Sequence, residues 1–265
     1  MDAHLIAASP DIAGVTTPAA TLGADQIEQY RRDGFLRVPG VLTSTEVAHY
    51  RAAAERSLTE LRALNPDRPT FTQVVNVWRD DPAMAELTLH PGLAALATQL
   101  AGMPLRLWHD HMLVKQPHNG AATEFHQDAP YWPHAGSRHW LSAWVALVDV
   151  PVERGCMSFL PGQHHRADLR AADLTDAHDL MTVAPDLVYA PRVTLPLRAG
   201  DATFHHGLTP HTANANATDD ARFAHVVIYM DAETWFDGRD HPVTTGADLE
   251  VGEAFPDALC PRLPR

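Results

Sequence analysis

The chain has 265 residues, 45% of them hydrophobic, which is enough for one large buried core. Its formal net charge is −13, with 20 Lys and Arg against 33 Asp and Glu, and the basic residues are scattered, so the sequence argues against nucleic acid as a partner. No segment approaches the roughly 20 apolar residues of a membrane-spanning helix, and two distant cysteines, Cys156 and Cys260, argue against a disulfide scaffold and favour a reducing cytoplasm.

The N-terminal stretch is expected to lie outside the folded domain. Residues 1–22 are rich in Ala, Thr and Pro and have no apolar period, which is typical of a flexible tail. The same stretch has few basic residues and no continuous apolar run, so no signal peptide is indicated. Residues 23–265 are then expected to form a single domain.

The first third of this domain has mainly helical character. Thr43 and Glu46 form a capping-box pattern before an apolar-periodic stretch that predicts a long helix. Gly34 and Gly102 supply helix stops, and His90-Pro91 interrupts the last helical region. We therefore expect helices over 24–33 and 44–64 and two helical segments within 80–102, with a short strand at 34–42.

From Leu105 onwards the sequence is β-prone. Short runs rich in aromatic and β-branched residues alternate with turn signals, which predicts an antiparallel barrel or sandwich. The expected strands lie within 105–117, 139–152, 193–197, 201–208 and 223–230. Residues 166–190 are more polar and indicate an insertion or lid, with a short helix around 171–181.

A metal site is indicated by His126 and Asp128. Positions i and i+2 of an extended chain project to the same face, so an imidazole and a carboxylate can reach one cation. With 17 His and 33 acidic residues, however, 17 × 33/265 gives about two such matches by chance. The pair alone therefore favours an ordinary surface histidine beside a carboxylate.

A second block near the C-terminus changes this interpretation. His211 is followed 11 positions later by Arg222. The order His-x-Asp, distal His and Arg resembles the phytanoyl-CoA dioxygenase (PhyH) family of Fe(II)/2-oxoglutarate-dependent oxygenases. Further segments in the same order support the resemblance, which covers roughly residues 24–232: DQIEQYRRDGFLRVPGVL, HPGLAALATQLAG, FHQDAPYWP and WVALVDVPVERGCMSFLPGQH.

The resemblance implies a mainly β fold with flanking helices around a double-stranded β-helix, the cupin-like jelly roll. It implies Fe(II) held by His126, Asp128 and His211, with 2-oxoglutarate and O2 as co-substrates. Arg222 is then the cation for the far carboxylate of 2-oxoglutarate, because a guanidinium pairs bidentately with a carboxylate.

Three further residues are expected to bind the co-substrate. They are Lys115, Gln127 and Thr212. The family often has Ser or Thr two residues after the distal His, but here that position is Ala213, and Thr212 or Thr203 are the possible substitutes.

The implied function is a dioxygenase that oxidises a C–H bond of a small organic molecule, most simply a hydroxylase in secondary-metabolite biosynthesis. Cyclisation, epimerisation or desaturation by the same iron chemistry stay open, as does a non-catalytic metal-binding sensor. Asp128 argues against halogenation, since halogenating relatives lack that carboxylate. A cupin-like site using His109 and His111 is a weaker alternative, His205 and His206 are placed near the site without being ligands, and the sequence does not decide whether the chain forms a homo-oligomer.

Overall fold

The computed structural model describes residues 21–64 and 71–264, and all statements about the fold concern these residues. Its α-helices are α1 (Ala24–Asp33), α2 (Ser44–Leu64), α3 (Pro82–Thr88), α4 (Pro91–Ala101) and α5 (Asp179–Val183). Its strands are β1 (Phe35–Val38), β2 (Phe71–Val75), β3 (Leu105–Lys115), β4 (Thr123–His126), β5 (His134–Ala135), β6 (Trp140–Ala146), β7 (Met157–Phe159), β8 (Val193–Leu195), β9 (Ala202–His206), β10 (His211–Ala213), β11 (Arg222–Asp231) and β12 (Trp235–Phe236). Short 3₁₀ helices lie at Val77–Arg79, Ala129–Tyr131, Val152–Arg154, Gln163–His165 and Pro185–Tyr189.

Two antiparallel sheets form the centre of the molecule. The large sheet has the order β1-β9-β6-β11-β3-β2, and the small sheet has the order β4-β10-β7-β8. The sheets meet through contacts such as the stacked rings of Phe35 and Phe159, whose centroids are 4.6 Å apart. This is the jelly-roll core that the family resemblance implied, and β5 and β12 form a separate two-stranded ribbon.

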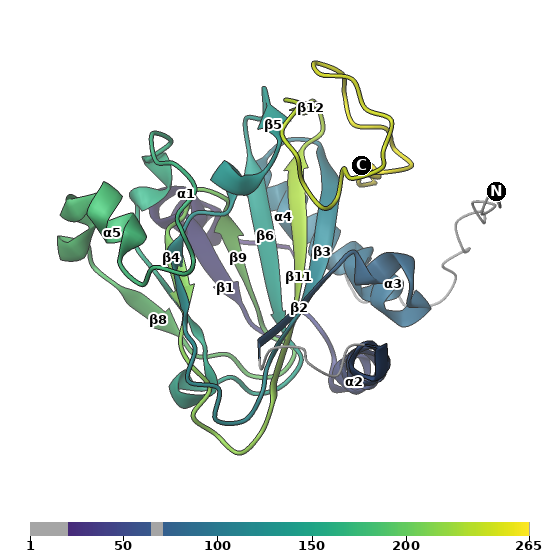
Figure 1. The fold of residues 1–265 in the computed structure, drawn as a ribbon, viewed down its shortest axis with the longest axis vertical. Coiled ribbons are helices and arrows are strands. Elements are labelled where there is room, and N and C mark those ends of the chain that lie inside the picture. Colours follow the sequence, from purple (N-terminus) through teal and green to yellow (C-terminus); the bar gives the residue numbers. More distant parts are fainter. Residues whose placement is uncertain (1–20, 65–70, 265) are drawn as a thin grey trace.

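Helices α1 to α4 lie on the side of the large sheet, whereas α5 lies beside the small sheet. α4 packs against β6 and α1, α1 also packs against β1, and α2 packs against α3. Figure 1 shows α2 and α3 on one side of the molecule and α5 on the opposite side, near β4 and β8. Because β11 lies between helices and the small sheet, both of its faces are buried, and its apolar run is continuous rather than alternating.

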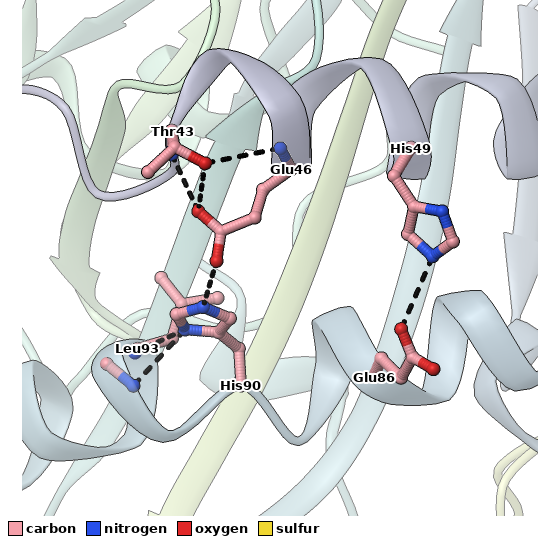
Figure 2. Close-up of polar contacts among 7 residues, drawn as sticks. Thr43, Glu46, His49, Glu86, His90 and Leu93 are labelled. Carbon is pink, nitrogen blue, oxygen red and sulfur yellow. Dashed lines mark hydrogen bonds and ion pairs between the residues drawn. The ribbon is translucent and has the colours of Figure 1, made fainter. Parts of the chain in front are cut away.

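One glutamate links the starts of two helices. Glu46 Oε2 accepts hydrogen bonds from the backbone N and the Oγ1 of Thr43, each at 2.7 Å, while the backbone N of Glu46 donates to Thr43 Oγ1 at 3.2 Å. Its other oxygen, Oε1, lies 3.3 Å from His90 Nε2, and His90 Nδ1 accepts from the backbone N of Gly92 at the start of α4 (Figure 2). The capping box expected from the sequence is therefore present, and it also orients the cap of α4.

Helix ends follow the glycines and prolines that the sequence marked. Gly34 and Gly102 end α1 and α4 with φ values of 84° and 65°, a left-handed backbone that favours glycine. Prolines stand at the first positions of α3 and α4, where no backbone donor is needed. The interruption near His90 separates these two helices as expected.

Three features differ from the sequence expectations. β2 and the small-sheet strands β4, β7 and β10 were not predicted, because runs of three to five residues carry little periodicity of their own. The helix expected around 171–181 begins only at Asp179, because Asp173 and Asp176 accept hydrogen bonds from the backbone N of Thr175 and His178 in local turns that compete with a helix.

The N-terminal tail and the expected lid can be placed only in part. Residues 1–20 of the predicted tail lie outside the described residues, and Leu22, at its end, is buried in the main core. Within 166–190, Leu169, Leu180 and Leu187 share a small apolar cluster with Leu160, separate from the main core. Among residues 21–64 and 71–264, no helix has the length and apolar character needed to cross a membrane.

The capping box yields a stability prediction. Replacing Thr43 with Ala removes the side-chain acceptor at the start of α2 and one donor to Glu46, so the free energy of unfolding should fall by about 1 kcal/mol. Urea denaturation measures this change. The matched control is Thr45→Ala, which deletes the same atoms from an exposed position inside α2 and should leave stability unchanged or slightly higher. Equal effects of both substitutions would contradict the role of the cap.

Candidate active site

His126, Asp128 and His211 come together at one point between the sheets. His126 is the last residue of β4 and His211 the first of β10, and the two are direct partners in the antiparallel pairing. Their ring centroids are 4.3 Å apart, and Asp128 Oδ1 lies 3.4 Å from His126 Nε2 and 3.8 Å from His211 Nε2. One ligand atom from each residue lies within 4.8 Å of the others, and no other group of this kind occurs in the described part of the chain.

Both imidazoles are oriented by backbone carbonyl groups. His126 Nδ1 donates to the carbonyl oxygen of Glu124 at 2.7 Å, and His211 Nδ1 donates to that of Thr209 at 2.9 Å. Because a carbonyl oxygen only accepts hydrogen bonds, each Nδ1 carries the proton. Each Nε2 is then unprotonated and lies on the side of Asp128, where its lone pair is available to a metal ion. The chain thus fixes the tautomer that binds a metal ion.

The charges of the group suit a divalent cation. Burial opposes ionisation of Asp128, but His211, His126 and His205 hold the pKa of this carboxyl well below its usual range, so it is a carboxylate at neutral pH. Burial lowers the pKa of His211 to about 3, which keeps its imidazole neutral. Burial also opposes charging of His126, although its contact with Asp128 outweighs this and raises its pKa. Two imidazoles and one carboxylate form the facial triad typical of non-haem iron.

The second oxygen of Asp128 is held from the large sheet. Ser142 Oγ on β6 donates to Asp128 Oδ2 at 2.9 Å, and His205 Nε2 on β9 lies 3.4 Å from the same oxygen. Ser142 and His205 are register partners in the β6–β9 pair. His205 was expected near the site from the sequence, whereas Ser142 was not, because only strand register brings Ser142 opposite the loop that carries Asp128.

A cavity of about 310 Å³ opens beside the triad. Arg222, at the start of β11, lines it and is only 1% exposed. Neither Nε nor Nη1 of this guanidinium has a hydrogen-bond partner among the described residues, and the group lies 5.3 Å from the centroid of Trp144. Burial lowers the pKa of Arg222 to about 9, so it stays charged at neutral pH. A buried cation with unused donors is a receptor for an anion.

The three other residues expected to bind the co-substrate make side-chain hydrogen bonds to backbone carbonyl groups. Lys115 Nζ donates to the carbonyl oxygens of Ala121, Ala213 and Asn214 at 2.7–3.1 Å. Gln127 Nε2 donates to two carbonyl oxygens, and Thr212 Oγ1 donates to a third. None of the three is among the residues that line the cavity, and Thr203 is likewise absent from the lining.

The competing histidines separate into two groups. His109 and His111 lie on β3 and line the same cavity as the triad, although neither belongs to the metal-binding group. His206 points to the other side of β9, into a second cavity that it shares with His139 and His164. His241, in the segment after β12, also lines the first cavity, and nothing in its local sequence marked it.

The chain is similar to known proteins over most of its length. The family model described as Phytanoyl-CoA dioxygenase (PhyH) matches residues 30–224. Among curated proteins, an L-proline trans-4-hydroxylase of Streptomyces griseoviridis is 27% identical over 226 residues, covering 76% of this chain and 84% of that protein.

Solved structures of non-haem enzymes are similar to this chain in both sequence and fold. The alpha ketoglutarate dependent carbocyclase SnoK from nogalamycin biosynthesis has 37% identity and a TM-score of 0.84, covering 95% of this chain and 100% of that one. The epimerase SnoN in complex with Fe3+, alpha ketoglutarate and nogalamycin RO has 39% identity and a TM-score of 0.78, covering 91% of this chain and 98% of that one.

Ser142 yields a prediction for metal binding. Replacing it with Ala removes the hydrogen bond that orients Asp128 Oδ2, so the affinity for a divalent metal ion should fall about tenfold while the fold is kept. Anaerobic titration with Fe(II) measures this change. The control is Ser158→Ala, which removes a hydroxyl bonded to Thr194 on the small sheet, away from the triad. Unchanged metal affinity in Ser142→Ala would show that this hydroxyl does not support the site.

Proposed function

The chain belongs to the phytanoyl-CoA dioxygenase family, and we infer that it is an Fe(II)- and 2-oxoglutarate-dependent oxygenase that attacks a C–H bond of a small organic molecule. The single observation that carries this proposal is the convergence of His126, Asp128 and His211 beside a cavity whose buried Arg222 lacks a partner for Nε and Nη1.

The residues of the site fit both Fe(II) and 2-oxoglutarate. His126, Asp128 and His211 would hold Fe(II) on one face and leave the cavity side for other ligands. When bound, iron and 2-oxoglutarate supply an oxidant from O2, with conversion of 2-oxoglutarate to succinate and carbon dioxide. The chain itself holds the ligands in their metal-binding tautomers, keeps Asp128 ionised and surrounds the reacting space with apolar walls such as Trp132 and Val226.

Arg222 would hold the far carboxylate of 2-oxoglutarate. Its Nε and Nη1 can donate together to the two oxygens of one carboxylate, and burial strengthens such a pair because water does not compete. The indole of Trp144 lies against the guanidinium and limits its positions. An anion at this point would also compensate a buried charge that is otherwise costly.

Thr123 is the residue we propose in place of the Ser or Thr that the family often has at position 213. Thr123 is the register partner of Ala213 across β4 and β10, and both residues line the cavity. Cross-strand partners project from the same face, so the Thr123 hydroxyl lies on the surface that a hydroxyl at position 213 would share. Thr212, by contrast, uses its hydroxyl to donate to the carbonyl oxygen of Thr123.

Hydroxylation is the simplest outcome, with ring closure or epimerisation as the second candidate. The second candidate is favoured by one observation, namely that the carbocyclase and epimerase structures share 37% and 39% identity with this chain, more than the 27% of the proline hydroxylase. Mass spectrometry of the product separates the outcomes. Hydroxylation adds one oxygen atom, ring closure or desaturation removes two hydrogen atoms, and epimerisation leaves the mass unchanged.

The setting of the reaction is also proposed. A small-molecule substrate fits the cavity, and a net charge of −13 argues against nucleic acid. Cys156 and Cys260 are buried and unpaired, which fits a reducing cytoplasm. A role in secondary metabolism follows the nogalamycin enzymes to which the chain is similar.

Removing a metal ligand should abolish the reaction. Asp128→Ala or His126→Ala should eliminate Fe(II)-dependent formation of succinate from 2-oxoglutarate, because the facial triad loses a ligand. Succinate is measured by chromatography, and circular dichroism checks that the fold is kept. His206→Ala, which alters a histidine in the second cavity, should retain the activity. Succinate formation by either ligand variant would overturn the assignment, and its absence in the unaltered protein with iron, 2-oxoglutarate and substrates would favour a sensor.

Removing the guanidinium should weaken 2-oxoglutarate binding selectively. Arg222→Ala should raise the dissociation constant for 2-oxoglutarate about 10- to 100-fold through loss of a charge-assisted pair, while the affinity for Fe(II) changes little. Arg222→Lys keeps the charge without the bidentate geometry, so its dissociation constant for 2-oxoglutarate should lie between those of the unaltered protein and Arg222→Ala. Arg56→Ala, on the exposed side of α2, serves as the control. A similar 2-oxoglutarate affinity in all four proteins would move the carboxylate site elsewhere.

A further inference from the structure

Two histidines of β3 form a polar patch in the same cavity. His109 and His111 project from the same face of β3, and their ring centroids are 4.5 Å apart. Their register partners on β11 are Ile228 and Val226, whereas Arg222 pairs with Lys115 at the other end of the two strands. The patch therefore lies at the end of the cavity away from the proposed 2-oxoglutarate site.

Hydrogen bonds assign a fixed proton to each ring. His109 Nδ1 lies 3.2 Å from the carbonyl oxygen of Asp110 and must donate to it, so His109 Nε2 is an acceptor. Gln73 Nε2 donates to His111 Nδ1 at 2.7 Å, so the proton of His111 is on Nε2, which is a donor. One acceptor and one donor thus stand side by side.

Both Nε2 atoms are buried without a partner. Within the described residues, neither His109 Nε2 nor His111 Nε2 makes a hydrogen bond. Buried polar atoms in native proteins are nearly always paired, and an unpaired atom costs free energy. A hydroxyl group complements an adjacent acceptor and donor, because it can donate to one atom and accept from the other.

The remaining surface indicates an uncharged and mostly apolar ligand. Among the described residues that line the cavity, Arg222 is the one Lys or Arg side chain. Its guanidinium is assigned to the carboxylate of 2-oxoglutarate under the proposed function. Burial lowers the pKa of His109 well below its usual range and that of His111 to about 4, so neither ring attracts an anion at neutral pH. Apolar side chains surround the patch: Val75, Leu113, Trp132, Val226 and Pro242.

We propose that His109 and His111, with Gln73 as the residue that orients His111, form a subsite that binds an alcohol group of an uncharged, largely apolar substrate. The inference rests on the proposed function, because it assigns the other end of the cavity to 2-oxoglutarate. His109 and His111 are substrate-positioning residues here and leave the metal ligands unchanged.

Binding of three matched probes tests the subsite without turnover. The protein is loaded with redox-inert Zn(II) and 2-oxoglutarate and titrated by calorimetry with 1-tetralol, 1-methyltetralin and tetralin-1-carboxylate. These share one apolar skeleton and differ in carrying a hydroxyl, a methyl or a charged group. The unaltered protein should bind the alcohol about tenfold more tightly than the methyl compound, as expected for two buried hydrogen bonds, and should bind the carboxylate more weakly than the alcohol.

Variants assign this preference to the two rings. His111→Leu and His109→Leu should each reduce the alcohol-to-methyl preference to about onefold to threefold, since a hydrogen-bonding atom is lost. His111→Gln keeps a donor at the end of the side chain and should retain most of the preference. His49→Leu makes the same change at an exposed position on α2 and should have no effect.

The result also separates this proposal from the proposed function. Failure of the Zn(II)-loaded protein to bind 2-oxoglutarate would count against the proposed function itself. Normal 2-oxoglutarate binding combined with no binding of the alcohol, with equal binding of alcohol and methyl compound, or with an unchanged preference in both Leu variants would overturn the hydroxyl subsite alone.

Discussion

The direct pairing of His126 with His211 across β4 and β10 is the constraint on which the site depends. Two imidazoles that face each other at a ring distance of 4.3 Å are useful only if something keeps them neutral and aimed at a common point. The backbone carbonyl groups of Glu124 and Thr209 orient the two rings through hydrogen bonds. Burial lowers the pKa of His211 and keeps its imidazole neutral. Asp128 then supplies the single negative charge. A one-residue slip between these strands would turn one ring to the opposite face and remove the site.

Residues of the large sheet also hold Asp128 in place. Ser142 and His205 are partners on β6 and β9 and reach across the sandwich to the second oxygen of Asp128. The carboxylate that would bind the metal is therefore fixed by both sheets, so relative movement of the sheets would disturb the metal ligands.

Sequence patterns predicted long and strongly marked features better than short ones. Capping signals, glycines and prolines located the helices between 24 and 101, since these signals act within a few residues of chain. The three-residue strands β7 and β10 were not expected, because they exist through pairing with neighbouring strands, which a single sequence does not reveal. The proposed metal ligands and Arg222 were chosen through a resemblance to a family. The co-substrate role expected of Lys115, Gln127 and Thr212 stays a prediction. Their polar atoms bond to carbonyl groups through tertiary contacts that spacing along the chain does not encode.

The register of β3 with β11 places the two proposed binding functions at opposite ends of one cavity. Arg222 pairs with Lys115, and Val226 pairs with His111 four residues along, a separation of roughly 14 Å at about 3.4 Å per residue. The triad lines the same cavity. A carboxylate held at one end and a hydroxyl held at the other would each lie at a fixed distance from the metal position. The carbon that is oxidised would then be selected by its distance from the anchored hydroxyl and not by its intrinsic reactivity. Positional selectivity on an apolar skeleton needs such an anchor, because apolar walls alone restrain translation along the cavity only weakly.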